Sequence, residues 1–340
     1  MITDQDILQD AEWLPHRYDE TNGSFRFRHV PRDVQREAAF LTDEHLPDTG
    51  AERVIPLERI DRRALPAAPI HFVFHSAYCC STLVARMFDA PGYSMGLVEP
   101  VVLNDVVGWR RRGAQPEKIA AVLDVALALL ARPFGDDRAV VVKPSNIVNS
   151  LAPAIMGLRA DAHAILLYAP IEDFLASIAV KGLWGRRWVR QAMIGQMQDG
   201  VLAQQFAPDE MFELTDLQVA GLGWLSHHSI YRKMQDRFGA GRLGICDSRS
   251  LLAEPAETVA KFYARFELHP GPEDSAAIAA GPAFTRNSKE STSYSRGDRE
   301  RQIAATREAN SDEIAKVAEW VRVVADGIGL DVAPVSSALR

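Results

Sequence analysis

Short apolar runs alternate with longer amphipathic stretches between residues 70 and 268. Four runs are β-rich and too short for helices, which predicts buried strands in 70–76, 137–146, 163–170 and 242–252. The stretches beside them have helical spacing and predict helices over 81–90, 116–132, 150–161, 171–182, 218–239 and 254–268. Alternating strands and helices favour an α/β fold with a mostly parallel sheet covered on both faces.

The two ends of the chain differ from this middle part. Residues 1–68 are mixed and charged, with one alternating strand at 23–30 and a helix at 32–46 that starts after Pro31. We expect them to form an N-terminal extension that packs on a main domain of residues 69–340. A last helix is predicted over 311–329, with Ser311 as its cap.

Composition narrows the function classes. The net charge of −7 argues against bulk binding to nucleic acid or to an anionic membrane. Three cysteines cannot form a disulfide framework and suit a reducing compartment. The first residues lack the apolar core of a signal peptide, and no apolar run reaches the length of a membrane span. We therefore expect a cytoplasmic protein, and the sequence leaves a homodimer open.

The candidate chemistry lies after the first strand, in "HSAYCCST" at residues 75–82. The length fits the phosphate-binding pattern G-x-x-x-x-G-K-[ST], but only Thr82 matches it. Main-chain N–H groups at the start of the following helix favour anions whatever the side chains are. The candidate anion-binding residues are Ser76, Ala77, Tyr78, Cys79, Cys80, Ser81 and Thr82. A strand–turn–helix without a ligand is the alternative interpretation of this stretch.

Four further segments stand in an order that resembles bacterial sulfotransferases, which use 3′-phosphoadenosine 5′-phosphosulfate (PAPS). The loop stands where that family has "G-M-P-[RK]-S-G-T-T", and "VEP" supplies a Glu about 20 residues later. "VVKPSN" matches "DK-x-P-x-N", "APIEDFLAS" matches "R-x-P-x-D-x-x-x-S", and "DSRSLLAEP" is similar to "YEDLLADP". The resemblance covers about residues 69–275 and implies a P-loop-type three-layer α/β/α fold.

For a sulfuryl transfer of this kind we assign roles to individual residues as a hypothesis. Lys143, His75 and the loop N–H groups would stabilise the transferring sulfuryl group, Glu99 would take the acceptor proton, and Ser177 would bind the 3′-phosphate. PAPS is then the cofactor, no metal is required, and the partner is a small-molecule acceptor with a hydroxyl or amine.

Departures from the family pattern concern its cations and glycines. Tyr78 stands at the loop arginine or lysine, Ala169 at the 3′-phosphate arginine, and His75 and Cys80 at two glycines. Replacement charge is expected from Arg286 and Lys289 in a Ser/Thr-rich segment, or from the basic run "GLWGRRWVRQ".

Three functions therefore remain open at this point. The first is a PAPS-dependent sulfotransferase. The second is a kinase-like phosphotransferase using ATP and Mg²⁺, against which Ser81 replaces the lysine of the P-loop pattern. The third is a ligand-binding scaffold that has lost the PAPS site. Redox chemistry of the adjacent pair Cys79–Cys80 is a weaker interpretation, because cysteine is also a small residue that suits a buried tight loop. The adjacent histidines at 227 and 228 lack the spacing of a pair of metal ligands.

Overall fold

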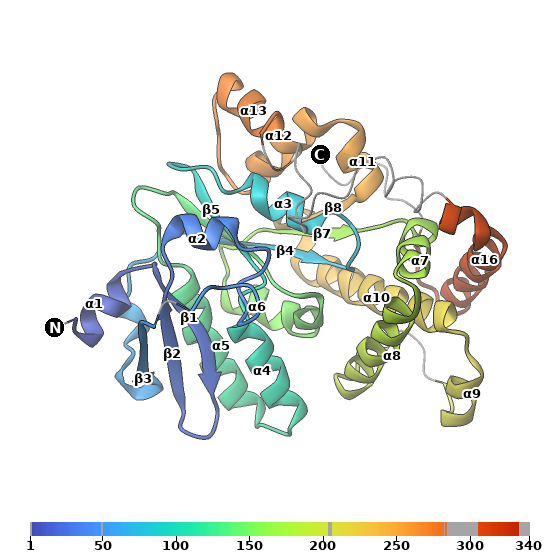
Figure 1. Ribbon diagram of the computed structural model, residues 1–340, viewed down its shortest axis with the longest axis horizontal. Coiled ribbons are helices and arrows are strands. Elements are labelled where there is room, and N and C mark those ends of the chain that lie inside the picture. The colour runs from blue at the N-terminus through green and yellow to red at the C-terminus, as the bar shows by residue number, and fades with distance from the viewer. Residues whose placement is uncertain (1, 49, 203–205, 282, 284–304, 333–340) are drawn as a thin grey trace.

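A parallel five-stranded sheet forms the centre of the molecule (Figure 1). The computed structural model describes residues 2–48, 50–202, 206–281, 283 and 305–332. The strands, in the order β5-β6-β4-β7-β8, are β4 (Ile70–His75), β5 (Ser94–Val98), β6 (Ala139–Lys143), β7 (Ala164–Tyr168) and β8 (Leu243–Asp247). Every neighbouring pair is parallel. The predicted α/β class with a mostly parallel sheet is confirmed.

Helices connect the strands and flank the sheet (Figure 1). They are α3 (Ser81–Met87), α4 (Val102–Arg111), α5 (Pro116–Leu130), η3 (Asn146–Leu151), α6 (Ala152–Leu158), α7 (Ile171–Val180), α8 (Gly182–Gln198), α9 (Pro208–Glu213), α10 (Asp216–Arg242), α11 (Ser248–Ala253), α12 (Pro255–Arg265), α13 (Pro272–Ala279) and α16 (Ser311–Gly327). Asn310 is the residue before α16, and the Ser311 hydroxyl donates to Glu308 O. The predicted cap at Ser311 is therefore displaced by one position.

The first sheet strand, β4, lies at the middle of the sheet. From β4 the chain moves outward to β5 and returns through β6, then crosses to β7 and β8 on the other side. The direction of the crossovers thus reverses at β4, and ligands of open α/β sheets bind at such a switch point. This topology places the loop after β4 at the centre of the sheet's carboxyl edge.

The strand β5 was not predicted, because Gly96 interrupts its apolar pattern and glycine weakens a strand. A Cβ at position 96 would lie 2.1 Å from the Ala85 carbonyl oxygen of α3. The glycine is therefore what lets α3 pack directly on β5, and only the packed structure gives a reason for it.

The N-terminal residues form a second, antiparallel sheet of β1 (Trp13–Asp19), β2 (Ser24–His29) and β3 (Glu52–Pro56), with α1 (Asp4–Gln9) before it. The short helical turns η1 (Leu57–Arg59) and η2 (Arg62–Ala64) lead to the main sheet. The strand predicted at 23–30 is confirmed, whereas β1 and β3 were missed. The helix predicted over 32–46 is only α2 (Arg32–Glu37). The chain leaves the helix because Leu41 pairs with the end of β5, donating to Val98 O (2.8 Å) and accepting from Val101 N (3.2 Å).

One arginine fixes this N-terminal part to the main sheet domain. Arg132 is 1% exposed and follows α5. Its guanidinium donates to carbonyls of Ile7 (2.8 Å), Asp10 (2.7 Å) and Trp13 (2.6 Å). Residues 2–48 and 50–68 therefore pack on the main domain, as expected, while a domain boundary at residue 68 stays a prediction.

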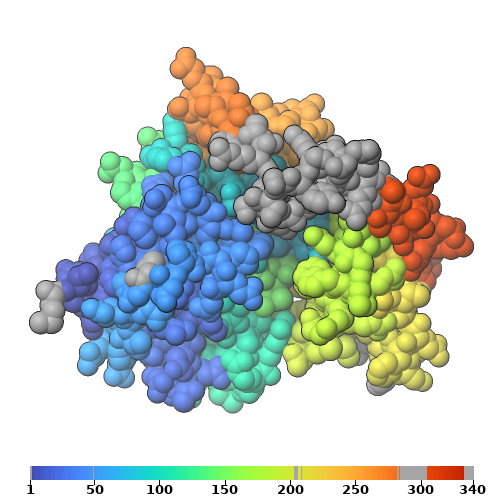
Figure 2. Space-filling model, viewed as in Figure 1, coloured from blue at the N-terminus to red at the C-terminus, as the bar shows by residue number. Residues whose placement is uncertain are grey.

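The N-terminal sheet and α8 both lie on the face turned to the viewer in Figure 2.

Among the described helices, none combines the length and the apolar character needed to cross a lipid bilayer.

Candidate functional site

The loop after β4 is held in an unusual backbone conformation. Ala77, Tyr78 and Cys80 have φ values of 72°, 52° and 63°, the left-handed region that favours glycine. Each such residue costs about 1–2 kcal/mol. Strain of this kind persists where the surrounding structure enforces it, and successive N–H groups in such turns form concave anion sites.

Polar groups in this turn lack protein partners. Within the described residues, the main-chain N–H groups of Ser81 and Thr82 donate to no protein acceptor. The Thr82 hydroxyl is buried and also has no hydrogen-bond partner. Buried polar groups without partners are rare in folded proteins, because each costs about 1–3 kcal/mol. A bound anion would satisfy these donors.

His75 ties the loop to the neighbouring strand end. Its Nδ1 accepts from the Ala77 N–H (3.1 Å), so Nε2 carries the hydrogen and donates to Pro144 O (3.0 Å). Both ring nitrogens are thus engaged. The bonds give His75 a positioning role in the loop, and its predicted contact with a sulfuryl group stays a prediction.

Lys143 and Glu99 meet beside the loop, at the carboxyl ends of the neighbouring strands β6 and β5, and Glu99 Oε1 lies 3.9 Å from His75 Nε2. Lys143 Nζ donates to Glu99 Oε1, and its ammonium lies 5.5 Å from the centre of the Phe40 ring. The side chain of Lys143 is 2% exposed and that of Glu99 is 20% exposed. Glu99 itself has a φ of 51°, a strained backbone that is held by its N–H bond to Lys143 O (2.7 Å).

The two loop cysteines are in different surroundings. Burial raises the pKa of Cys79 to about 12, the negative charge of Cys80 adds to this, and the charge of Lys143 opposes it. A thiol with such a pKa is not a nucleophile at neutral pH.

Tyr78 stands where the family has a cation, and it belongs to an aromatic row. Its ring contacts Phe174 (6.1 Å between centroids) and Trp188 (5.4 Å), and Trp188 stacks with Trp184 (6.5 Å). Burial raises the pKa of Tyr78 to about 12. Beside this row lies a cavity of about 20 Å³, lined by Ser76, Asn146, Trp188, Gln196 and His227 among others. It has room for about one water molecule, so an acceptor does not fit in it as it stands.

Ser177 lies on α7, the helix that follows β7. Its hydroxyl donates to Asp173 O (2.8 Å), one turn earlier. The Asp173 carboxylate accepts from Arg249 Nε (2.6 Å) and from the Arg307 guanidinium. Arginines 249 and 307 were not singled out from the sequence, because only the fold brings them to α7.

Two basic segments were expected to replace the lost cations, and the structure describes only one of them. Arg186 and Arg190 on α8 pair with Asp216 at 3.7 and 2.6 Å, so acidic side chains already neutralise them. Arg286 and Lys289 lie outside the described residues, and their predicted role stays a prediction.

A buried polar network connects the start of the loop, at His75, to η3 and α10. Asn149 Nδ2 donates to His75 O (2.9 Å) and lies 3.0 Å from His227 Nδ1. Burial lowers the pKa of His227 to about 4, so the ring is neutral at physiological pH. Asn149 and His227 carry no recognisable motif, and sequence reasoning had no signal for them.

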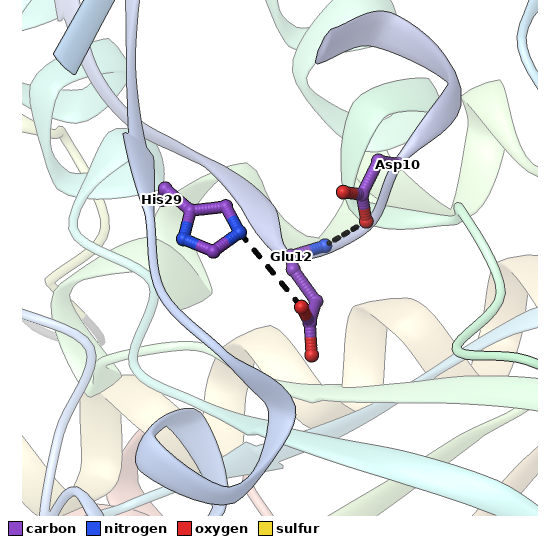
Figure 3. A group of neighbouring side chains, drawn as sticks. All are labelled: Asp10, Glu12 and His29. Carbon is purple, nitrogen blue, oxygen red and sulfur yellow. Dashed lines mark hydrogen bonds and ion pairs between the residues drawn. The ribbon is translucent and has the colours of Figure 1, made fainter. Parts of the chain in front are cut away.

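One group of potential metal ligands lies far along the chain from the loop, in the N-terminal part. The ligand atoms of Asp10, Glu12 and His29 lie within 4.8 Å of one another (Figure 3). Both carboxylates already accept main-chain N–H groups, Asp10 from Glu12 (2.9 Å) and Glu12 from Arg32 (2.8 Å). This cluster therefore has structural functions that need no ion.

No protein-family model and no curated protein matches this chain. Among solved structures, it is similar to a sulfotransferase domain from the curacin biosynthetic pathway, at 12% identity over 66% of this chain and 82% of that domain, with a TM-score of 0.41. It is also similar to a sulfotransferase from Mycobacterium tuberculosis H37Rv, at 15% identity over 72% of this chain and 76% of that one, with a TM-score of 0.40. A sulfotransferase from Mycobacterium avium is similar at 10% identity over 76% of this chain and 79% of that one, with a TM-score of 0.45. Similarity of this degree does not extend to ligands or activity.

Proposed function

We propose that the protein is a sulfotransferase-like enzyme that binds PAPS at residues 76–82 and transfers its sulfuryl group to a small-molecule hydroxyl or amine. The observation that carries the proposal is the strained turn with its unsatisfied donors. Three residues at positive φ shape the turn, and its two N–H groups and the buried Thr82 hydroxyl are donors that a bound anion would satisfy.

PAPS, when bound, supplies the sulfuryl group and the leaving phosphate. Catalysis of such a transfer needs positioning and positive charge at the developing negative charge, as in phosphoryl transfer. Lys143 supplies that charge from a buried position, where it is worth more than at the surface. Glu99 accepts the proton of the acceptor as the acceptor oxygen or nitrogen attacks sulfur. His75 holds the turn in shape.

Calorimetry tests the donor site. The full chain is titrated with 3′-phosphoadenosine 5′-phosphate, and with ATP in the presence and absence of Mg²⁺. We expect binding of the bisphosphate without Mg²⁺. Tighter binding of ATP with Mg²⁺ would instead favour the kinase-like phosphotransferase. Binding of no nucleotide would favour the ligand-binding scaffold, an alternative that the loss of cations at Ala169 and Tyr78 supports.

Thr82→Val tests the cradle itself. Valine keeps the shape of threonine but removes the hydroxyl, so we expect nucleotide affinity to fall by about tenfold, the value of one hydrogen bond. Thr258→Val is the matched control, since Thr258 is also buried but lies on α12. Equal affinities of both variants would place the nucleotide elsewhere.

Turnover tests the roles of Lys143 and Glu99. With PAPS and a panel of phenolic and amine acceptors, Lys143→Ala and Glu99→Ala should each lower kcat by at least about 100-fold. Turnover that survives both substitutions would exclude these roles.

A further inference from the structure

Exposed apolar side chains gather on α8. Of the ten large apolar side chains that are exposed in the described part of the chain, four belong to this helix: Leu183, Trp184, Ile194 and Met197. They are 50–78% exposed. Single apolar side chains are normal at a protein surface, whereas a group of them on one element marks a contact with another surface.

The exposed side chains follow one face of the helix. They recur at intervals of three and four residues, as one helical face requires, at Leu183, Arg187, Arg190, Ile194 and Met197. The opposite face packs on α7 and α10, with Val189 and Met193 buried. In Figure 2 the helix, in yellow-green, lies at the surface turned to the viewer. The apolar side chains of the exposed face are therefore accessible to a partner.

The same helix carries positive charge. α8 contains three arginines and no acidic residue. Arg186 and Arg190 pair with Asp216, at 3.7 and 2.6 Å. Within the residues that the structure describes, Arg187 and Lys181, the residue before α8, form no ion pair. Unpaired positive charge therefore accompanies the exposed apolar side chains.

An anionic lipid surface fits this combination. Tryptophan and aliphatic side chains enter the boundary between headgroups and acyl chains, while basic side chains bind the lipid phosphates. The net charge of −7 does not prevent this contact, because salt screens charges more than about 8 Å away. A second copy fits less well, since α8 would offer its copy arginines and no acidic side chain.

The exposed face also adjoins the candidate site. Trp184 stacks with Trp188 (6.5 Å between centroids), and Trp188 contacts Tyr78 of the anion-binding turn (5.4 Å). A lipid surface against α8 would thus lie two ring contacts from the turn.

We propose that the exposed face of α8 docks on the surface of an anionic membrane, with Ile194 and Met197 entering the headgroup boundary and Arg187 bound to lipid phosphate. The inference goes beyond the proposed function and does not depend on it, because vesicle binding and nucleotide binding are measured separately.

Vesicle sedimentation tests the docking. The full chain is sedimented with vesicles of phosphatidylcholine alone, or of phosphatidylcholine and phosphatidylglycerol in equal parts. We expect the wild type to bind the mixed vesicles only, and more weakly as the salt concentration rises. Arg187→Glu changes the local charge by two units and should weaken binding about 10–30-fold. Ile194→Ser/Met197→Ser should weaken it at least about 10-fold, because two apolar side chains no longer leave water.

Two further variants are matched controls. Lys233→Glu makes the same change of net charge at an exposed lysine of α10 that forms no ion pair in the described part of the chain. Val54→Ser/Val323→Ser removes two exposed apolar side chains, from β3 and from α16. Both controls should bind the mixed vesicles as the wild type does.

Several results would overturn the proposal. They are a wild type that does not bind the mixed vesicles or binds both kinds equally, binding that survives either Arg187→Glu or Ile194→Ser/Met197→Ser, and equal losses in the controls. Light scattering without vesicles checks the remaining occupant. A wild-type dimer that becomes a monomer in Ile194→Ser/Met197→Ser would make this face an interface between copies instead.

Discussion

At the scale of single residues, the site consists of side chains and backbone held in costly states. Cys80 adopts a conformation that glycine adopts freely, Thr82 buries an unpartnered hydroxyl, and Lys143 buries a charge. Each of these states opposes folding, so other interactions must compensate for it. Together they make the candidate site, residues 75–82, 99 and 143, a region of strained backbone and buried polar groups.

Replacing Cys80 by glycine should stabilise the protein. Glycine removes a steric cost of about 1–2 kcal/mol, offset by about 0.5–1 kcal/mol of lost chain entropy, which leaves a gain of up to about 1.5 kcal/mol. Urea unfolding measures the change. Ser81→Gly is the control at the first position of α3, and it should be destabilising by about 0.5–1 kcal/mol. A destabilised Cys80→Gly variant would contradict the strain argument.

Lys143 and Glu99 should be strongly coupled in stability. In Glu99→Gln the buried ammonium loses its counter-charge, and in Lys143→Met the carboxylate loses its donor, so each should cost about 2–4 kcal/mol. The double variant should cost at least about 1 kcal/mol less than the sum of the two. Additive free energies of unfolding in the double-mutant cycle would show that the pair does not interact.

At the scale of secondary-structure elements, the site depends on how α10 and β4 are packed. His227 of α10 and His71 of β4 are both buried, and burial lowers the pKa of each from 6.5 to about 4. The unfolded chain therefore binds protons near pH 6.5 that the folded chain takes up only near pH 4. Between these values the free energy of unfolding falls as the pH falls, by up to about 1.4 kcal/mol per pH unit for each histidine.

His227→Asn should make this loss of stability shallower. Asparagine keeps an acceptor for Asn149 Nδ2 but does not titrate, so one of the buried histidines that take up protons on unfolding disappears. Urea unfolding at pH 7, 6 and 5 gives the slope, and His269→Asn is an exposed control that should leave it unchanged. An unchanged slope in His227→Asn would mean that this ring is already accessible to protons in the folded chain.

At the scale of the whole molecule, the N-terminal part completes the site as well as covering the domain. Phe40 lies against Lys143, and Leu41 pairs with the end of β5, immediately before Glu99. The anchor is Arg132, whose guanidinium holds the segment between α1 and β1. Loosening the N-terminal sheet should therefore change the packing around Lys143.

Arg132→Met tests this anchor. Methionine fills the space but removes the guanidinium donor of the buried Ile7 and Trp13 carbonyls, so we expect a loss of about 3 kcal/mol or more. Hydrogen exchange should quicken first in the amides of β1 and β2. Arg138→Met, at an exposed arginine over the Tyr93 ring, is the control and should change little. Uniform exchange throughout Arg132→Met would show that the N-terminal part does not unfold separately.

The sequence by itself determined the elements with strong local signals. The apolar runs of β4, β6, β7 and β8 are continuous, and the helices between them have clear spacing, so the α/β class and the position of the loop followed from periodicity. The lysine at the end of β6 could be expected at the sheet's carboxyl edge, because parallel strands bring their carboxyl ends to one edge, whereas Glu99 was named only from its place in the family pattern.

Only the tertiary structure decided what depends on contacts between distant segments. The strand β5 exists because Gly96 packs under α3, and α2 ends at Glu37 because Leu41 bonds to Val98. The positive φ values of the turn, the engagement of both His75 nitrogens and the meeting of Arg249 and Arg307 at Asp173 have no local signal. Their causes are long-range hydrogen bonds and packing, which a single sequence does not display.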